Sequence, residues 1–189
     1  MTRILALPMS LRRDSFNRRL ANAAAEVAPE FAEFEVGSIA GIPLYDADVE
    51  LREGQPAASE ALKDKIAELD GVLFVTPEYA TSIPGVAKNA LDWMARPPDD
   101  VPRVWADLPV GLIGATPGRG GTRGSQQAWL TVLRYLGTRL WTGSSLYMAS
   151  ARDSFDDEGR LTDEKVRELL TRYVSGFAEH CRDLPRGRP

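Results

Sequence analysis

The chain contains 189 residues, of which 43% are hydrophobic and 26% are charged. These values are typical of one globular domain with a sizeable core, so we expect a single domain over residues 1–189 that needs neither disulfides nor a structural metal. The 23 basic and 27 acidic residues give a formal net charge of −4 and are spread along the whole chain. This distribution lacks the basic stripe of a nucleic-acid-binding protein, and we expect no nucleic-acid partner.

The number of cysteines and the length of the apolar segments indicate the cellular compartment of the protein. The one cysteine, Cys181, cannot form an internal disulfide, which is typical of a reducing environment. The apolar segment at the N-terminus is shorter than the core of a secretion signal, and no apolar run reaches membrane-spanning length. We therefore expect a cytoplasmic protein without a membrane partner.

The N-terminal part of the chain alternates between short apolar runs and segments with helical spacing. The first run stops at Pro8 and is followed by a polar, basic loop over residues 9–14. An irregular stretch over residues 42–46 separates the second strand from the second helix. The predicted elements are a strand over residues 3–7, a helix that ends at Pro29, a weaker strand over residues 31–36 and a helix over residues 57–69.

Residues 71–93 form the central stretch of the sequence. A strand is predicted over residues 72–75, and it leads into a polar loop that two prolines, Pro77 and Pro84, make rigid. Helical spacing begins at Gly85. Ligands bind at the carboxyl ends of strands in open parallel sheets, so this loop is a candidate binding wall.

The C-terminal part continues the same alternation, with a surface loop over residues 97–102 before it. The predicted elements are a strand over residues 108–113, a loop with four glycines over residues 114–121, a helix from near Thr122 with Gly137 as its C-cap, a strand over residues 146–149 and a long final helix. Five strands alternating with five helices predict a three-layer α/β/α sandwich. The five-stranded parallel sheet should have the flavodoxin-like order 2-1-3-4-5.

In that order the first, third and fourth strands are neighbours, so the loops after them share one edge of the sheet. The first loop offers Ser10, Arg12, Ser15 and Asn17 at the N-terminus of a helix, where backbone N–H groups and a guanidinium can bind a phosphate. The simpler interpretation is that Ser15 or Asp14 only caps this helix. The second loop offers Tyr79 for a flat heterocycle, and the glycines of the third allow close backbone approach.

Several other sites are disfavoured by residue type. No G-x-x-x-x-G-K-[ST] motif occurs, and the stretch over residues 118–123 lacks the third glycine of a dinucleotide fingerprint. The single histidine, His180, has no partners for a catalytic triad or a zinc site and is interpreted as a packing or surface residue. We expect no metal site and no catalytic side chain.

Three motifs carry a family resemblance, which extends over nearly the whole chain. The sequences S-L-R-x-x-S-F-N at residues 10–17, T-P-E-Y-x-x-S-I-P-G-x-x-K-N-A-L-D-W at residues 76–93 and G-A-T-P-G at residues 114–118 resemble the NADPH-dependent FMN reductase family, which includes chromate, quinone and azo-dye reductases. The resemblance implies FMN as cofactor and NADPH or NADH as co-substrate.

The resemblance also implies roles for individual residues. The FMN phosphate would be held by Ser10, Arg12, Ser15 and Asn17; the isoalloxazine ring would be lined by Pro77, Glu78, Tyr79 and Ala80; and the opposite side would be closed by Thr116, Gly118 and Gly121. The helix over residues 86–93 resembles the family's subunit interface, which implies a homodimer or tetramer. Core packing of Leu91 and Trp93 is the alternative.

The chain differs from the family pattern at three positions. Pro8 and Met9 precede the first serine where the family usually has glycine, Asp14 places a carboxylate near the phosphate, and Ala80 replaces a frequent asparagine. Arg12 and Arg13 can offset the charge of Asp14.

The leading functional hypothesis is an FMN-containing oxidoreductase that takes hydride from NAD(P)H and passes electrons by a ping-pong route to a quinone, azo dye, chromate or similar small-molecule acceptor. An electron carrier of flavodoxin type would usually be more acidic and would cover the flavin with more aromatic rings. Two further alternatives remain: a flavin reductase that supplies reduced FMN to a monooxygenase, and an FMN-free interaction protein that keeps the fold.

Overall fold

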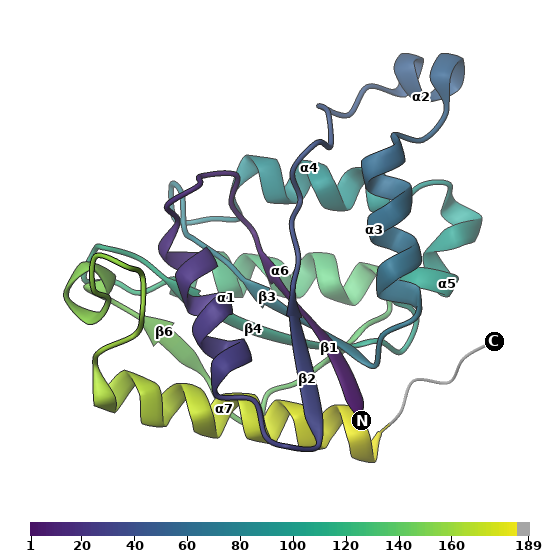
Figure 1. The fold of residues 1–189 in the computed structure, drawn as a ribbon. Coiled ribbons are helices and arrows are strands. Elements are labelled where there is room, and N and C mark those ends of the chain that lie inside the picture. The colour runs from purple at the N-terminus through teal and green to yellow at the C-terminus, as the bar shows by residue number, and fades with distance from the viewer. Residues whose placement is uncertain (185–189) are drawn as a thin grey trace.

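A parallel β-sheet runs through the middle of the protein (Figure 1). The computed structural model describes residues 1–184. The strand order is β2-β1-β3-β4-β5, with β6 also paired to β4, which confirms the predicted flavodoxin-like sheet with one additional strand. The strands are β1 (Thr2–Pro8), β2 (Ala32–Val36), β3 (Gly71–Val75), β4 (Pro109–Ala115), β5 (Arg139–Leu140) and β6 (Leu146–Met148).

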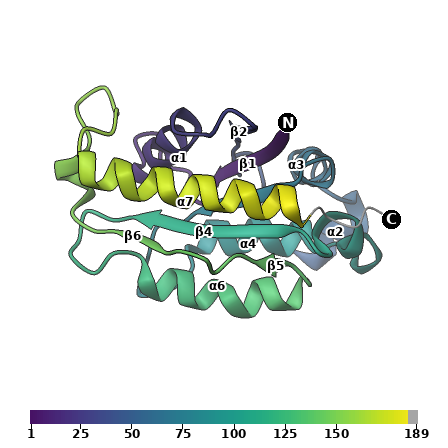
Figure 2. The ribbon, with the colours of Figure 1, turned by 90° about the horizontal axis from the view of Figure 1, so that it is seen from below.

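Helices cover both faces of this sheet. Helices α1 (Phe16–Glu26) and α7 (Glu164–Asp183) pack on one face, whereas α3 (Ala57–Ala67), α4 (Gly85–Met94), α5 (Val101–Trp105) and α6 (Arg123–Tyr135) pack on the other. Figure 2 shows α7 and α6 on opposite sides of β4. The remaining helices are α2 (Ala47–Glu53) and two 3₁₀ turns, η1 (Pro98–Asp100) and η2 (Ala151–Ser154).

The strands divide the core in two because successive side chains of a strand point to opposite faces. In β1, Ile4 and Ala6 pack with α1 and α7, whereas Leu5 and Leu7 pack toward α3 and α4. All four are at most 1% exposed. Burial on both faces explains why these strands read as continuous apolar runs.

The fifth position of the sheet differs from the prediction, since it is occupied by two short strands. β5 pairs with the start of β4 and β6 with its end, and the chain leaves the sheet over residues 141–145. The hydroxyl of Tyr173 on α7 fills the gap between the two strands. Its Oη accepts a hydrogen bond from the Leu112 N–H at 2.8 Å and donates to the Leu112 carbonyl at 2.9 Å. The last strand also ends at Met148 instead of the predicted Ala149.

Helix α2 was not predicted, because none of its residues is buried and it therefore shows no apolar periodicity. It projects from the body of the protein (Figure 1). Tyr45, which precedes it, connects it to α4: its N–H donates to Asn89 Oδ1 at 2.8 Å, and its ring packs edge-on against Trp93. The predicted surface loop over residues 97–102 contains η1 and the start of α5.

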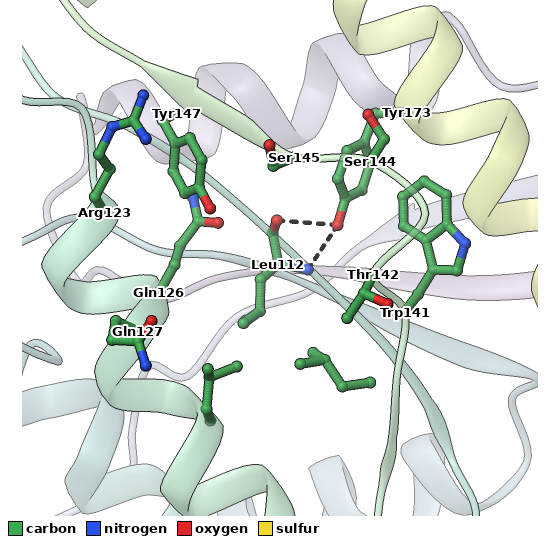
Figure 3. A pocket seen from close by; sticks show the side chains of 12 residues that line it. Leu112, Arg123, Gln126, Gln127, Trp141, Thr142, Ser144, Ser145, Tyr147 and Tyr173 are labelled. Atoms are coloured by element: carbon green, nitrogen blue, oxygen red, sulfur yellow. Dashed lines mark hydrogen bonds between the residues drawn. The ribbon is translucent and has the colours of Figure 1, made fainter.

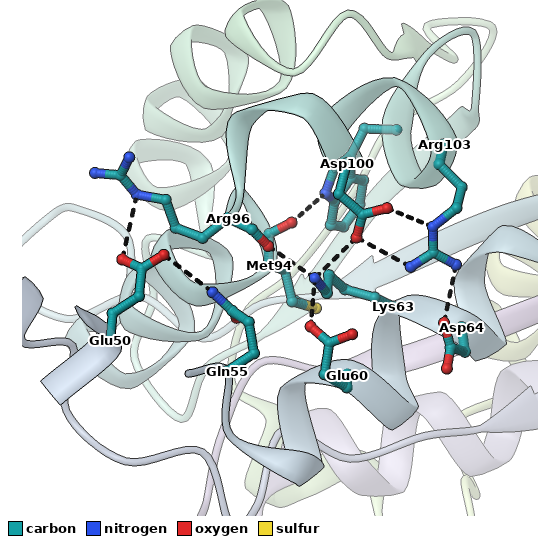
Figure 4. A network of polar contacts seen from close by, with 10 residues as sticks. Glu50, Gln55, Glu60, Lys63, Asp64, Met94, Arg96, Asp100 and Arg103 are labelled. Atoms are coloured by element: carbon teal, nitrogen blue, oxygen red, sulfur yellow. Dashed lines mark hydrogen bonds and ion pairs between the residues drawn. The ribbon is translucent and has the colours of Figure 1, made fainter. Parts of the chain in front are cut away.

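A buried lysine connects α3 to η1 and α5 (Figure 4). The Lys63 side chain is fully buried and forms ion pairs with Glu60 and, at 2.8 Å, with Asp100; it also donates to the Arg96 carbonyl at 2.7 Å. Asp100 accepts two further hydrogen bonds from Arg103. The hydrogen bonds from Arg103 and Lys63 lower the pKa of Asp100 to about 2.

Within residues 1–184, no helix is both long enough and apolar enough to cross a membrane.

Candidate active site

Three loops meet at the carboxyl edge of the sheet, as the predicted strand order requires. They follow β1, β3 and β4, which are adjacent in the sheet. Backbone hydrogen bonds join their first residues to neighbouring strands: Met9 N–H donates to Val75 O at 2.9 Å, and Thr76 N–H donates to Ile113 O at 2.8 Å. We call them the first loop (residues 9–15), the second loop (residues 76–84) and the third loop (residues 116–122).

The first loop ends in a capped helix. Ser15 is the N-cap of α1, and its side chain accepts a hydrogen bond from the Asn17 N–H at 3.2 Å, as the simpler interpretation of the sequence predicts. Ser10 Oγ accepts from the Arg12 N–H at 3.2 Å. Both serines are buried, whereas the Arg12 side chain is exposed.

The same loop has the features of an anion site. The first turn of α1 contains no acidic residue. Arg12 forms no ion pair with any described residue. Within residues 1–184, five backbone N–H groups of the loop have no hydrogen-bond acceptor: those of Ser10, Leu11, Arg13, Asp14 and Ser15. Free N–H groups, a helix N-terminus and a guanidinium fit a phosphate group.

Asn17 connects the first loop to the third. Its Nδ2 donates to the Ala115 carbonyl at 2.9 Å, and its Oδ1 accepts from the Ala115 N–H at 2.9 Å. Both residues are buried. The Asn17 side chain therefore fixes α1 to the end of β4 and keeps one amide hydrogen for another acceptor.

The second loop contains a tight two-residue turn. Tyr79 and Ser82 exchange backbone hydrogen bonds of 3.3 and 3.0 Å, and the two residues between them, Ala80 and Thr81, have φ angles of +49° and +59°. This is the geometry of a type I′ turn, which favours Asn-Gly. Pro77 before the turn is buried, and the Tyr79 ring is 54% exposed.

Thr81→Gly is expected to raise the free energy of unfolding by about 1 kcal/mol, because a β-branched residue at positive φ is strained and glycine is not. Chemical denaturation measures this change. The same substitution at Thr131, an exposed position of α6, should instead lower stability, because glycine weakens a helix. Equal destabilisation at both positions would contradict the assignment of strain to the turn.

Glu78 is half-buried, and its carboxylate contacts the start of α6. Its Oε2 accepts a hydrogen bond at 3.0 Å from the N–H of Ser125, in the first turn of α6. The neighbouring Thr76 hydroxyl lies 2.9 Å from Ser125 Oγ and accepts from Trp129 Nε1 at 3.1 Å. No sequence motif relates a strand end to a helix of another segment, so the contact of Thr76 with Ser125 and Trp129 could not be predicted.

The third loop is held by its own backbone and by the segment after β6. Thr116 Oγ1 accepts from the Gly118 N–H at 3.2 Å, and the Gly118 carbonyl accepts from the Ser150 N–H at 2.9 Å. Gly121 has a φ angle of +69°, and a Cβ at this position would lie 2.9 Å from Tyr147 Cβ. Gly121 is therefore required both by its backbone conformation and by the close approach of Tyr147.

A cavity of about 340 Å³ opens where the fifth strand is interrupted (Figure 3). It lies beside the third loop, between α6 and residues 140–147, and the Arg123 guanidinium sits 4.5 Å from the centre of the Tyr147 ring. None of the residues that the sequence predicted for the site lines it. The lining residues labelled in the figure are Leu112, Arg123, Gln126, Gln127, Trp141, Thr142, Ser144, Ser145, Tyr147 and Tyr173.

The three loops together suit a flat ligand with a phosphate at one end. The first loop can bind the phosphate, and the second loop presents free N–H groups at Glu78, Ala80 and Thr81, which have no acceptor within residues 1–184. Such groups can bind the polar edge of a heterocycle. The glycines of the third loop permit close contact with the same ligand.

Comparison with known proteins identifies the family. The family model for NADPH-dependent FMN reductases matches residues 2–153. A 2-hydroxy-1,4-benzoquinone reductase from Burkholderia is 39% identical over 174 residues, which cover 92% of this chain and 93% of that protein. An NAD(P)H-dependent FMN reductase from Pseudomonas aeruginosa is 37% identical over 182 residues, covering 96% of each.

A solved structure agrees with these matches. The flavoenzyme NAD(P)H:(acceptor) oxidoreductase FerB from Paracoccus denitrificans superposes with a TM-score of 0.87 at 30% identity, covering 98% of this chain and 100% of that chain. Its whole length therefore corresponds to the fold described above. The chain belongs to the NADPH-dependent FMN reductase family and is an oxidoreductase that uses FMN, with NAD(P)H as co-substrate.

Proposed function

We propose that the protein is a single-domain quinone reductase, in which FMN binds across the three loops with its phosphate at the first. The phosphate would be held by Ser10, Arg12, Ser15 and Asn17, the ring would lie along Pro77, Glu78, Tyr79 and Ala80, and the other side would be closed by Thr116, Gly118 and Gly121. The observation that carries this proposal is the set of N–H groups before α1 that have no acceptor within residues 1–184, together with the Arg12 guanidinium, which forms no ion pair with those residues.

In this proposal the side chains position the reactants and carry out no proton transfer. Bound FMN would supply two-electron redox chemistry. The exposed Tyr79 ring and the glycines of the third loop leave an open face where a nicotinamide and then a flat acceptor can bind in turn. Quinones suit such a face, and two of the similar proteins are quinone reductases, which supports quinones as acceptors. Azo dyes and chromate are further candidate acceptors.

We further propose that the protein forms a homodimer or a tetramer through α4 and is located in the cytoplasm. Leu91 and Trp93 are at most 2% exposed within the single chain, which supports core packing for these two side chains, so the exposed residues of α4 would form the seam. The exposed side of α4 carries Lys88, which pairs with Asp92 across one helical turn. Size-exclusion chromatography with light scattering gives the oligomeric state.

Replacing Ser10 and Arg12 together with alanine is expected to weaken FMN binding about 30-fold or more, since a lost hydrogen bond to a charged group costs about 2 kcal/mol. Quenching of FMN fluorescence by the apoprotein measures the dissociation constant. Arg3→Ala is the control, because Arg3 is an exposed arginine at the opposite edge of the sheet. Wild-type affinity in the double variant would show that the phosphate binds elsewhere.

Anaerobic mixing of the FMN-loaded protein with NADPH or NADH tests the activity. Rapid bleaching of the flavin absorption followed by reoxidation with benzoquinone is expected of a quinone reductase. An electron carrier would be bleached slowly by either nucleotide without a partner reductase. A reductase that supplies free flavin would turn over added FMN while retaining little of it.

A further inference from the structure

We infer that Glu78 is a positioning residue, which locks the second and third loops into one body through the start of α6. This inference deepens the proposed function, because the two loops are those proposed to enclose the flavin ring. It assigns the Glu78 side chain a contact with the protein's own backbone, while the backbone N–H of Glu78, which has no acceptor within residues 1–184, stays available to the ring.

The first turn of α6 lacks a cap of its own. Its N-cap residue, Thr122, makes no side-chain capping bond, and the turn contains no acidic residue. Helices leave their first N–H groups unpaired and are stabilised by negative charge at that end. The Glu78 carboxylate accepts a hydrogen bond from the Ser125 N–H at 3.0 Å and places a negative charge at this end of the helix. Glu78 thus caps α6 from a loop 47 positions earlier in the chain.

A second set of bonds fixes the start of the same loop to α6. Thr76 Oγ1 accepts from Trp129 Nε1, lies 2.9 Å from Ser125 Oγ and donates to the Pro77 carbonyl at 2.9 Å. Thr76, Ser125 and Trp129 are all completely buried. Buried, satisfied networks of this kind are rigid, so the residue before Pro77 cannot shift without moving α6.

Close packing completes the connection at the tip of the second loop. A Cβ at Gly124 would lie 2.6 Å from Thr81 Cγ2, 2.7 Å from the Thr81 carbonyl and 3.1 Å from Glu78 Oε2. The turn therefore rests directly on the first turn of α6. Since the third loop enters α6 at Thr122, the two loops share one support, and a ligand between them meets a preorganised site.

The role of Glu78 can be separated from a direct ligand contact by comparing two substitutions. Glutamine keeps an oxygen that can accept from the Ser125 N–H, whereas alanine removes the acceptor. If the carboxylate only orders the loops, glutamine restores the site. If its charge contacts FMN or the nicotinamide, glutamine and alanine fail alike.

Two measurements on the full chain test this. Glu78→Ala is expected to weaken FMN binding by the apoprotein about 10-fold and to speed hydrogen–deuterium exchange of the Ser125 amide, because a lost acceptor costs about one factor of ten in affinity. In Glu78→Gln, the FMN dissociation constant and the exchange rate of the Ser125 amide should each stay within about 3-fold of the wild-type value. Glu26→Ala, an exposed acid at the far end of α1, is the control for charge removal.

Three outcomes would overturn the inference: wild-type FMN affinity in Glu78→Ala, equal loss in Glu78→Ala and Glu78→Gln, or unchanged exchange at Ser125 in Glu78→Ala. The exchange measurement needs no cofactor. Wild-type protein that binds no FMN would therefore refute the proposed function while leaving the connection between Glu78 and α6 testable by itself.

Discussion

Gly114→Ala is expected to abolish FMN binding and to lower the free energy of unfolding by about 3 kcal/mol. A Cβ at Gly114 would lie 2.1 Å from the Thr76 carbonyl and 2.3 Å from Thr122 Oγ1. Neither atom can move easily, because the Thr76 carbonyl belongs to the backbone at the end of β3 and Thr122 is fully buried at the start of α6. The substitution would push apart two of the loops that form the site.

The third loop, which follows β4, offers a matched control. Gly120→Ala adds a methyl group where no atom lies within 4 Å, at a position without positive φ, and should leave stability within about 0.5 kcal/mol. Urea denaturation and FMN titration compare the two variants. Similar losses of stability and FMN affinity in Gly114→Ala and Gly120→Ala would show that these glycines act through backbone flexibility. The close contact between β4 and the second loop would then be unimportant.

Asp100→Ala is expected to destabilise the fold by about 3 kcal/mol, because among the described residues it leaves the fully buried Lys63 with only the Glu60 carboxylate and one carbonyl as partners. Asp64→Ala is the control. Asp64 pairs with the same Arg103 but its side chain is 65% exposed, and such pairs contribute less than about 1 kcal/mol. Equal effects would mean that the buried lysine does not depend on Asp100.

The contribution of Asp100 should also depend on pH. Its pKa is about 2 in the folded protein, below the ordinary value of 3.8, chiefly because Arg103 and Lys63 donate hydrogen bonds to the charged form. The stabilisation is present above about pH 4 and is lost as the pH falls toward 2, by about 2 kcal/mol in all. The difference in unfolding free energy between wild type and Asp100→Ala should shrink over this range.

The strands that carry the site could be predicted from the sequence, because β1, β3 and β4 are buried on both faces and read as continuous apolar runs. Their order places the three loops together. The fifth strand could not be predicted in its observed form, since two residues of β5 show no periodicity. Helix α2 was missed for a related reason, as it buries nothing.

The candidate site was predictable only as a set of loops. Ser15 and Asn17 lie at a helix start that is visible in the sequence, whereas the direction of the Glu78 side chain depends on α6, nearly fifty residues later. Sequence spacing does not indicate such contacts. Side chains that bridge two loops are set by tertiary packing, so their roles had to come from the structure.

The hydroxyl of Tyr173 has a consequence for the behaviour of the folded protein in concentrated solution. Strands with unpaired backbone groups at a sheet edge can recruit strands of other molecules and start aggregation. At the break between β5 and β6, the Leu112 N–H and carbonyl are both occupied by this one hydroxyl, and Tyr173 as a whole is 1% exposed. The interrupted edge thus offers no template for intermolecular β-pairing at Leu112.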